Sequence, residues 1–177
     1  MLKTGASCTS KRQAERKNGG KPKNAAAVLV GKKTQEVIMF IKQLSIFLEN
    51  KGGSLASVLK ILSGQKINIF SASLADTNDF GVLRVLVSDT DRAYNVLKEK
   101  GITSKASDVV GVCVPNETGG FSKVVQLILD AGLNISYIYG LSVQNDGANI
   151  VMKTDDLDKT VSILKAAGVK LLEQADL

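Results

Sequence analysis

The 177-residue sequence contains no histidine and only two cysteines. Without histidine, the chain lacks the usual general base at neutral pH, any histidine-containing nucleophilic triad and every histidine metal ligand. Cys8 and Cys113 lie far apart and form no CxxC motif, so we expect neither a zinc site nor a disulfide framework. These absences predict a protein without a metal or cofactor, in a reducing, cytoplasmic compartment.

Long apolar runs are also missing from the sequence. No run approaches the roughly 20 apolar residues that span a bilayer, so we expect no membrane partner. Hydrophobic residues make up 44% of the chain and charged residues 23%. Because this balance is typical of globular proteins, a packed core is expected.

The positive charge is confined to the N-terminal part of the chain. The net charge is +6, but residues 1–38 hold nine basic and two acidic residues, which leaves 14 basic and 15 acidic residues in 39–177. Residues 1–38 show no sustained hydrophobic period and are predicted to form a disordered basic tail. Two other interpretations are an organellar targeting segment and a native start at Met39.

The two halves of the remaining sequence repeat each other without a gap. Adding 66 to a residue number in the first half gives its equivalent in the second. A gapless repeat of this length indicates two copies of one supersecondary unit. The matched pairs are Asn50 and Asn116, Gly53 and Gly119, Leu55 and Phe121, Asn68 and Asn134, and Ile69 and Ile135.

Each copy is predicted to have βαββαβ topology, the ferredoxin-like arrangement of the α+β class. Alternating apolar residues predict strands, and apolar residues at i, i+3, i+4 and i+7 predict helices. The units are expected at residues 39–106 and 107–177, joined by a link of about two residues and therefore packed rigidly. Gly101 matches Gly168 with an offset of 67, so one extra residue is expected near the last helix.

The paired pattern of a strand, Asn-x-x-Gly-x-Leu/Phe, a helix and Asn-Ile resembles the ACT domain, a small-molecule sensor module of amino-acid metabolism. The resemblance covers residues 41–173, and the whole chain is similar to stand-alone tandem ACT proteins of bacteria. The family turn usually reads Asp/Asn-x-Pro-Gly-x-Leu, whereas Gly52 and Thr118 occupy the proline position here.

The resemblance also implies a ligand site. In the serine-sensing ACT domain of phosphoglycerate dehydrogenase, a histidine and an asparagine before the turn, and an asparagine opening the second strand, hold the ligand. The asparagine positions are matched in both copies, but the histidine position is Leu48 or Val114, which argues against serine itself. The predicted ligand-binding residues are Asn50, Gly52, Gly53, Ser54, Leu55, Asn68 and Ile69 in copy one, and Asn116, Thr118, Gly119, Gly120, Phe121, Asn134, Ile135 and Tyr137 in copy two.

Elementary chemistry supports an amino-acid ligand at these turns. A helix N-terminus offers unpaired N–H groups and partial positive charge to a carboxylate, and glycines allow close approach. An asparagine side chain both donates and accepts hydrogen bonds, so it suits a group with an ammonium and a carboxylate. The competing interpretation is that asparagine and glycine are simply the ordinary residues of strand-to-helix turns.

The predicted edge strands, residues 69–75 and 135–142, are expected to pair with each other because unpaired edges favour aggregation. Related ACT pairs form one eight-stranded sheet with all four helices on one face. Asn50 would then share a pocket with Asn134, and Asn116 with Asn68. This pairing is expected either within one chain or between two chains of a homodimer.

The leading prediction is a non-catalytic regulatory protein that binds a free amino acid between ACT units and acts on an enzyme of amino-acid metabolism. The first alternative is a nucleic-acid-binding protein with RRM-like topology, for which Phe47 and Phe80 are the candidate stacking aromatics. The second is an enzyme of acylphosphatase type, which needs an arginine where Lys51 and Glu117 stand.

Three residues outside the turns leave alternatives open. Tyr137 and Tyr139 are predicted on one face of a strand, where they either pack or contact a ligand. Arg84, in the predicted third strand, either binds an anion or extends its charged end into solvent.

Overall fold

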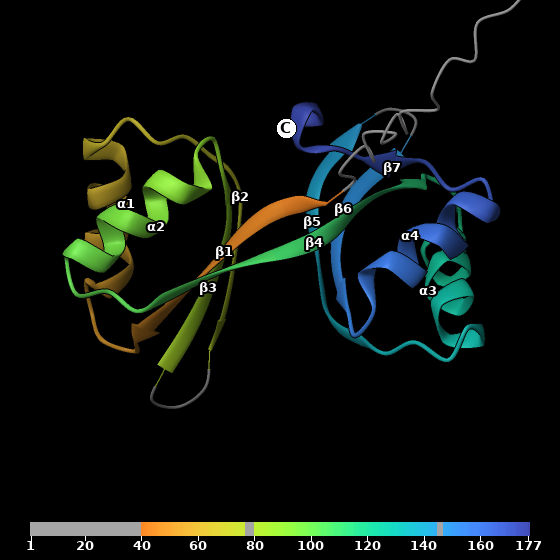
Figure 1. The fold of residues 1–177 in the computed structure, drawn as a ribbon, viewed down its shortest axis with the longest axis horizontal. Helices are drawn as coiled ribbons and strands as arrows, with labels where there is room; N and C mark the ends of the chain where they lie inside the picture. The colour runs from red at the N-terminus through yellow and green to blue at the C-terminus, as the bar shows by residue number, and fades with distance from the viewer. Residues whose placement is uncertain (1–39, 77–79, 145–146) are drawn as a thin grey trace, which may run out of the picture. The chain divides into compact units, whose positions relative to one another are not determined.

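The computed structural model describes residues 40–76, 80–144 and 147–177 (Figure 1). The basic tail predicted for residues 1–38 lies outside these ranges. No helix in the described part of the chain is long and apolar enough to cross a membrane.

Two βαββαβ repeats follow each other, as the sequence predicts. The helices lie in pairs, α1 with α2 and α3 with α4 (Figure 1). The elements of the first repeat are β1 (Ile41–Glu49), α1 (Ser54–Gly64), β2 (Ile69–Asp76), β3 (Phe80–Val87), α2 (Thr90–Glu99) and the first half of β4 (Ser104–Pro115). The second repeat has the rest of β4, α3 (Gly120–Asp130), β5 (Ile135–Gln144), β6 (Gly147–Thr154), α4 (Leu157–Ala166) and β7 (Leu171–Leu172), before a 3-10 turn at Gln174–Asp176.

The second helix of each repeat begins at an aspartate that caps it. Asp89 accepts a hydrogen bond from the Arg92 backbone N–H at 3.0 Å, and Asp156 accepts one from the Lys159 N–H at 2.9 Å. These carboxylates satisfy unpaired amides and complement the positive end of the helix dipole.

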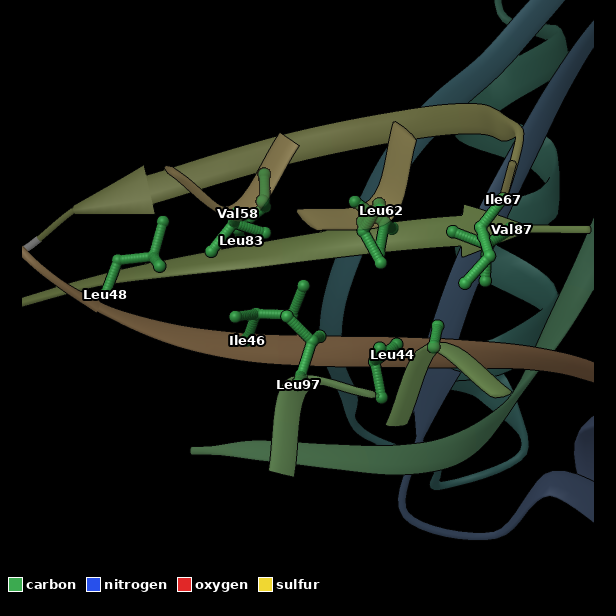
Figure 2. Packing of buried hydrophobic residues seen from close by; sticks show 11 residues of the cluster. Leu44, Ile46, Leu48, Val58, Leu62, Ile67, Leu83, Val87 and Leu97 are labelled. Atoms are coloured by element: carbon green, nitrogen blue, oxygen red, sulfur yellow. The ribbon is translucent and has the colours of Figure 1, made fainter. Parts of the chain in front are cut away.

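Each repeat has its own apolar core between its sheet and its helices. In the first repeat, alternate residues of β1 face α1 and α2, where they meet Val58 and Leu62 (Figure 2). The alternation in β1 therefore marks the helix-covered face, as predicted. The β1 residues of this core are Leu44, Ile46 and Leu48, and the equivalent β4 residues of the second repeat are Val110, Val112 and Val114.

The sheet has seven strands rather than the eight that we expected. Its order is β2-β3-β1-β4-β6-β5, and β7 also pairs with β4. The expected fourth strand and the expected first strand of copy two are one continuous strand, β4. It pairs with β1 through residues 104–109 and with β6 through residues 110–115, so a single strand serves both repeats.

The expected ladder between β2 and β5 is not formed in the described part of the chain. The two strands lie beside each other, and the Ser71 hydroxyl donates to the Gly140 carbonyl at 3.3 Å. Register shifts occur between Ile69 and Ser71 and between Gly140 and Ser142. Bulges of this kind interrupt the regular alternation of donors and acceptors that a ladder requires.

The extra residue of the second repeat lies in β5, not near Gly168. Gly140 opposes Ile150 and Ser142 opposes Asn149, so Leu141 has no direct partner on β6. The strand accommodates the insertion as a bulge, and every later residue is displaced by one. Leu141 packs beside the inner apolar cluster.

The helices of both repeats cover the same face of the sheet. Leu44, which faces α1 and α2, is opposite Ala106 of β4, and Val110 lies on that same face of β4 under α3 and α4. The other face is enclosed as well, by an inner cluster that contains residues of both repeats. Its buried members are Ile41, Leu86, Val109, Val151 and Leu172.

Candidate functional site

The first helix of each repeat begins without a side-chain cap. The residues preceding α1 and α3 are Gly53 (φ 90°) and Gly119 (φ 86°), both in the left-handed conformation, and neither helix has an acidic residue in its first turn. This contrasts with the aspartate-capped α2 and α4. The first amide of each helix donates within the turn, from Ser54 to the Lys51 carbonyl and from Gly120 to the Glu117 carbonyl. The positive dipole ends and the next amides of α1 and α3 are left for another acceptor.

The predicted asparagines lie at strand ends beside these turns. Asn50 and Asn116 follow β1 and β4, and Asn68 and Asn134 precede β2 and β5. All four are exposed, and none of their side chains has a hydrogen-bond partner in the described part of the chain. Their amides are therefore available to a ligand.

The backbones that carry Asn68 and Asn134 are held in the same way. The Asn68 N–H donates to the Ser88 hydroxyl at 3.0 Å, and the Asn134 N–H donates to Asp155 Oδ1 at 3.2 Å. The equivalent positions in the two repeats thus have equivalent supports.

Contacts between the repeats show how β2 and β5 run past each other. Ser71 contacts Gly140, whereas Arg84, the cross-strand partner of Ser73, lies over the ring of Tyr137. The contact moves backward along β5 as it moves forward along β2, so the strands are antiparallel.

This direction pairs the asparagines across the repeats. Because the strands are antiparallel, the start of β5, with Asn134, lies toward the end of β2. The end of β2 pairs with the start of β3, and so does the end of β1, which places Asn50 at the same end of the sheet. The same relationship places Asn116 and Asn68 at the other end. That each pair shares a pocket stays a prediction.

The other predicted ligand residues divide into exposed and packed groups. Leu55 and Phe121 are 38% and 47% exposed on the first turns of α1 and α3, while Ile69 and Ile135 pack against the two helix-side cores. Gly52, Gly53, Thr118 and Gly119 are exposed, Ser54 is half-buried and Gly120 is buried. An added Cβ at Gly120 would lie 2.5 Å from the Pro115 carbonyl oxygen.

A hollow lies beside each of the two turns. The first, of about 630 Å³, is lined by the end of β1, the start of α1 and the loop after α2; the second, of about 660 Å³, is lined by the equivalent elements of the second repeat. Equivalent lining residues are Phe47 and Cys113, Ser54 and Gly120, and Gly101 and Gly168.

Exposed ion pairs flank both turns. Lys51 contacts Glu49 at 2.6 Å, and Lys123 contacts Glu117 at 2.8 Å. A hydrogen bond from each lysine lowers the pKa of its glutamate. Because both pairs are solvent-exposed, they contribute little to folding stability.

The inner face of the sheet carries a polar cluster that the sequence did not reveal. Gln43 of β1 is fully buried, donates to Tyr137 Oη and accepts from Tyr139 Oη, both at 2.9 Å. The two tyrosine rings stack with centroids 6.5 Å apart, and Arg84 lies over Tyr137. Burial raises the pKa of the Tyr139 phenol, and the neighbouring Tyr137 adds to the effect.

The signal for this cluster was weak in the sequence. The structure confirms the prediction that the two tyrosines lie on one strand face, whereas for Arg84 the sequence leaves open an anion site or a solvent-exposed end. Gln43 alternates with the core residues of β1 and therefore suggested a solvent-facing position. It is buried because the second repeat covers that face.

Among the described residues, no three cysteine, aspartate or glutamate side chains group as metal ligands do.

Comparison with known proteins places this chain among ACT domain pairs and shows which solved structures it resembles. The family model of the ACT domain pair matches residues 39–177. A crystallised protein from Bacteroides thetaiotaomicron is 40% identical with a TM-score of 0.74, over 78% of this chain and 95% of that chain. The regulatory subunit of aspartate kinase from Thermus thermophilus is 15% identical with a TM-score of 0.55, over 75% of this chain and 93% of that one, which shows likeness of fold alone. None of the curated proteins matches.

Proposed function

Because this chain belongs to the ACT domain pair family, we propose that it is a non-catalytic regulatory protein that senses a free amino acid. The ligand binds at the turns before α1 and α3, in two sites that each include residues of both repeats. Ligand binding in turn regulates an enzyme of amino-acid metabolism.

The observation that carries this proposal is the pairing of two uncapped helix ends with four free asparagines. The amides at the start of α1 suit a carboxylate, and Asn50 with Asn134 offers acceptors to the ammonium and further donors to the carboxylate. The equivalent set at α3 contains Asn116 and Asn68. The hollows, each lined by one repeat alone, adjoin these helix starts at Ser54 and Gly120.

The two sites are unlike in ways that predict different ligand preferences. Phe121 and Gly120 in the second turn replace Leu55 and Ser54 in the first, and the second hollow has a more apolar lining. Binding between the repeats would restrict their relative movement, so a ligand stabilises one arrangement over others. The aspartate kinase regulatory subunits of similar fold support regulation of an enzyme as the output.

A thermal-shift screen of the full-length protein against the twenty amino acids tests this function. A ligand at 100 times its dissociation constant adds about 2.7 kcal/mol of stability, or roughly 5 to 10 °C for a chain of this size. We expect one amino acid, or a chemically related few, to produce such a shift. Uniformly unchanged melting temperatures would rule out amino-acid sensing.

Matched variants locate the ligand. For each amino acid that shifts the melting temperature, Asn50→Ala or Asn116→Ala should reduce the shift, whereas Asn95→Ala, which changes an exposed asparagine of α2, should not. An undiminished shift in the double variant Asn50→Ala/Asn116→Ala would place the site elsewhere.

Burial of part of the sheet face argues against nucleic-acid binding through an RRM-like surface. An RRM stacks bases on the sheet face opposite its helices. On that face of the first repeat, Gln43 and Leu86 are both 0% exposed because the second repeat covers them. The candidate stacking aromatics Phe47 and Phe80 are 45% and 57% exposed. An electrophoretic shift with single-stranded RNA tests this alternative directly.

A further inference from the structure

Arg84 is a half-buried cation without an anionic partner. Its guanidinium carbon lies 4.1 Å from the centroid of the Tyr137 ring, and its Nε is fully enclosed without a hydrogen-bond acceptor. Across residues 40–76, 80–144 and 147–177, no carboxylate pairs with it. A cation–π contact stabilises the charge but does not satisfy the N–H groups of the fork.

The hydrogen bonds of Gln43 leave two hydroxyl protons near Arg84 unused. The Gln43 amide nitrogen donates to Ser45 Oγ at 3.0 Å and to Tyr137 Oη at 2.9 Å, while its oxygen accepts from Tyr139. A hydroxyl that accepts a bond still carries its own proton. Ser45 and Tyr137 can therefore each donate to another group.

These donors converge on Arg84. Ser45 of β1 and Ser73 of β2 are its direct cross-strand partners, and Tyr137 lies under the guanidinium. Side chains of direct partners lie about 5 Å apart on the same face of a sheet. The cluster thus presents hydrogen-bond donors and a positive charge to one place.

The fold itself does not require this polarity. The equivalents of Gln43, Ser45 and Arg84 in the second repeat are Val109, Gly111 and Val151, and Ser45 opposes Arg84 just as Gly111 opposes Val151. Val109 and Val151 belong to the buried inner cluster. The same position is therefore packed with apolar side chains in one repeat and supplied with donors in the other.

We propose that Arg84, with the hydroxyls of Ser45 and Tyr137, binds the carboxylate of a small organic acid on the inner face of the sheet. A guanidinium fork matches the two oxygens of a carboxylate, and a partly desolvated setting strengthens the hydrogen bonds. The bound anion joins β1 and β3 of the first repeat to β5 of the second. Tyr137, one of the predicted amino-acid-binding residues, is used here on the inner face, and this site does not depend on the asparagines at the turns.

Sodium acetate is the probe, with acetamide as its neutral analogue and sodium chloride holding the ionic strength constant. With the full-length protein, about 100 mM acetate, a hundredfold excess over a millimolar dissociation constant, should raise the melting temperature by roughly 5 to 10 °C. Acetamide should have no effect. Arg84→Gln should abolish the acetate shift, while Arg92→Gln, which changes an exposed arginine of α2, should retain it. An equal acetate shift in Arg84→Gln, or none in the wild type, overturns the proposal.

A second measurement keeps the test decisive if Arg84→Gln does not fold. The chain has four arginines, so a 15N spectrum of the wild-type arginine side chains contains few Nε–H signals. Arg84→Lys assigns the Arg84 signal by its loss. Acetate should shift this signal and leave that of Arg92 in place, whereas an unmoved Arg84 signal at saturating acetate contradicts the site.

Discussion

The side-chain amide of Gln43 donates a hydrogen bond to the Tyr137 hydroxyl at 2.9 Å, although the two residues are 94 positions apart. Gln43 belongs to β1 and Tyr137 to β5, so this bond connects one repeat to the other. With Tyr139 donating to its oxygen, the buried amide satisfies most of its hydrogen-bonding capacity. The contact fixes where β5 lies against the first repeat.

Replacing Gln43 should therefore destabilise the whole chain. Gln43→Ala removes three hydrogen bonds, to Ser45, Tyr137 and Tyr139, and leaves the tyrosine hydroxyls without their partner, which should cost about 2 to 4 kcal/mol of unfolding free energy. Gln126→Ala, on the exposed surface of α3, should cost less than about 0.5 kcal/mol. Urea denaturation monitored by circular dichroism measures both, and a near-neutral Gln43→Ala would show that the cluster is not a stabilising contact.

Gln43 also shows where sequence reasoning stops. Its polar side chain alternates with the apolar face of β1, which ordinarily indicates solvent. Burial of the second face depends on β5, a strand distant in the sequence. The core residues Leu44 and Ile46, in contrast, were predictable because their period matches a helix-covered strand face.

The join between the repeats was hidden for a similar reason. Ala106 and Ser107 are predicted to form a short link between the units, yet β4 continues through them because β1 pairs with this half of the strand. The βαββαβ units and the glycine turns were predictable from the repeat, since these depend on local patterns. The sequence predicts the extra residue near the last helix because the offset between the repeats is seen to change from 66 to 67 only at the matched pair Gly101 and Gly168. The bulge at Leu141 lies well before that pair.

The inner face of the sheet is packed closely at Gly111. A Cβ added there would lie 2.6 Å from Ile41 Cδ1 and 2.9 Å from Leu172 Cβ, so Gly111→Ala should cost about 1 to 3 kcal/mol. Gly140→Ala is the matched control in β5, because its Cβ would meet no atom within 4 Å. In urea denaturation, Gly111→Ala should have a lower midpoint than Gly140→Ala. Equal midpoints would show that the inner face accommodates the added methyl group without loss of stability.

Tyr139 predicts a loss of stability in alkali. Burial raises the pKa of the Tyr139 phenol above its ordinary value of about 10. The folded chain then keeps a proton that the unfolded chain loses, so the unfolding free energy is unaffected below pH 10. Above it, stability decreases by up to about 1.4 kcal/mol per pH unit until the folded phenol also ionises.

The comparison is with Tyr139→Phe, which lacks this proton. Tyr137 and Arg84, which face the phenol, and the lysines are common to both proteins. The difference between the two unfolding free energies should be constant from pH 8 to about 10 and then shrink. If the unfolding free energies of the two proteins change in parallel above pH 10, the pKa of Tyr139 is not raised in the folded chain.

The proposed amino-acid sites predict coupling between asparagines of different repeats. Once the thermal-shift screen identifies the ligand, Asn50→Ala and Asn134→Ala should each weaken its binding about tenfold, because each removes hydrogen bonds to a charged group. If both side chains contact one ligand molecule, the double variant should depart from additivity by roughly 0.5 to 3 kcal/mol.

Asn50→Ala with Asn116→Ala provides the control, because these turns belong to different predicted sites and their effects should add. Calorimetric titration of the single and double variants gives the coupling energies. Asn50 and Asn68 lie at opposite ends of the first repeat's sheet, since β1 ends near the start of β3 and β2 begins opposite its end. Strong coupling between Asn50 and Asn68, with none between Asn50 and Asn134, would show that each ligand is held within one repeat and that the bridged arrangement is wrong.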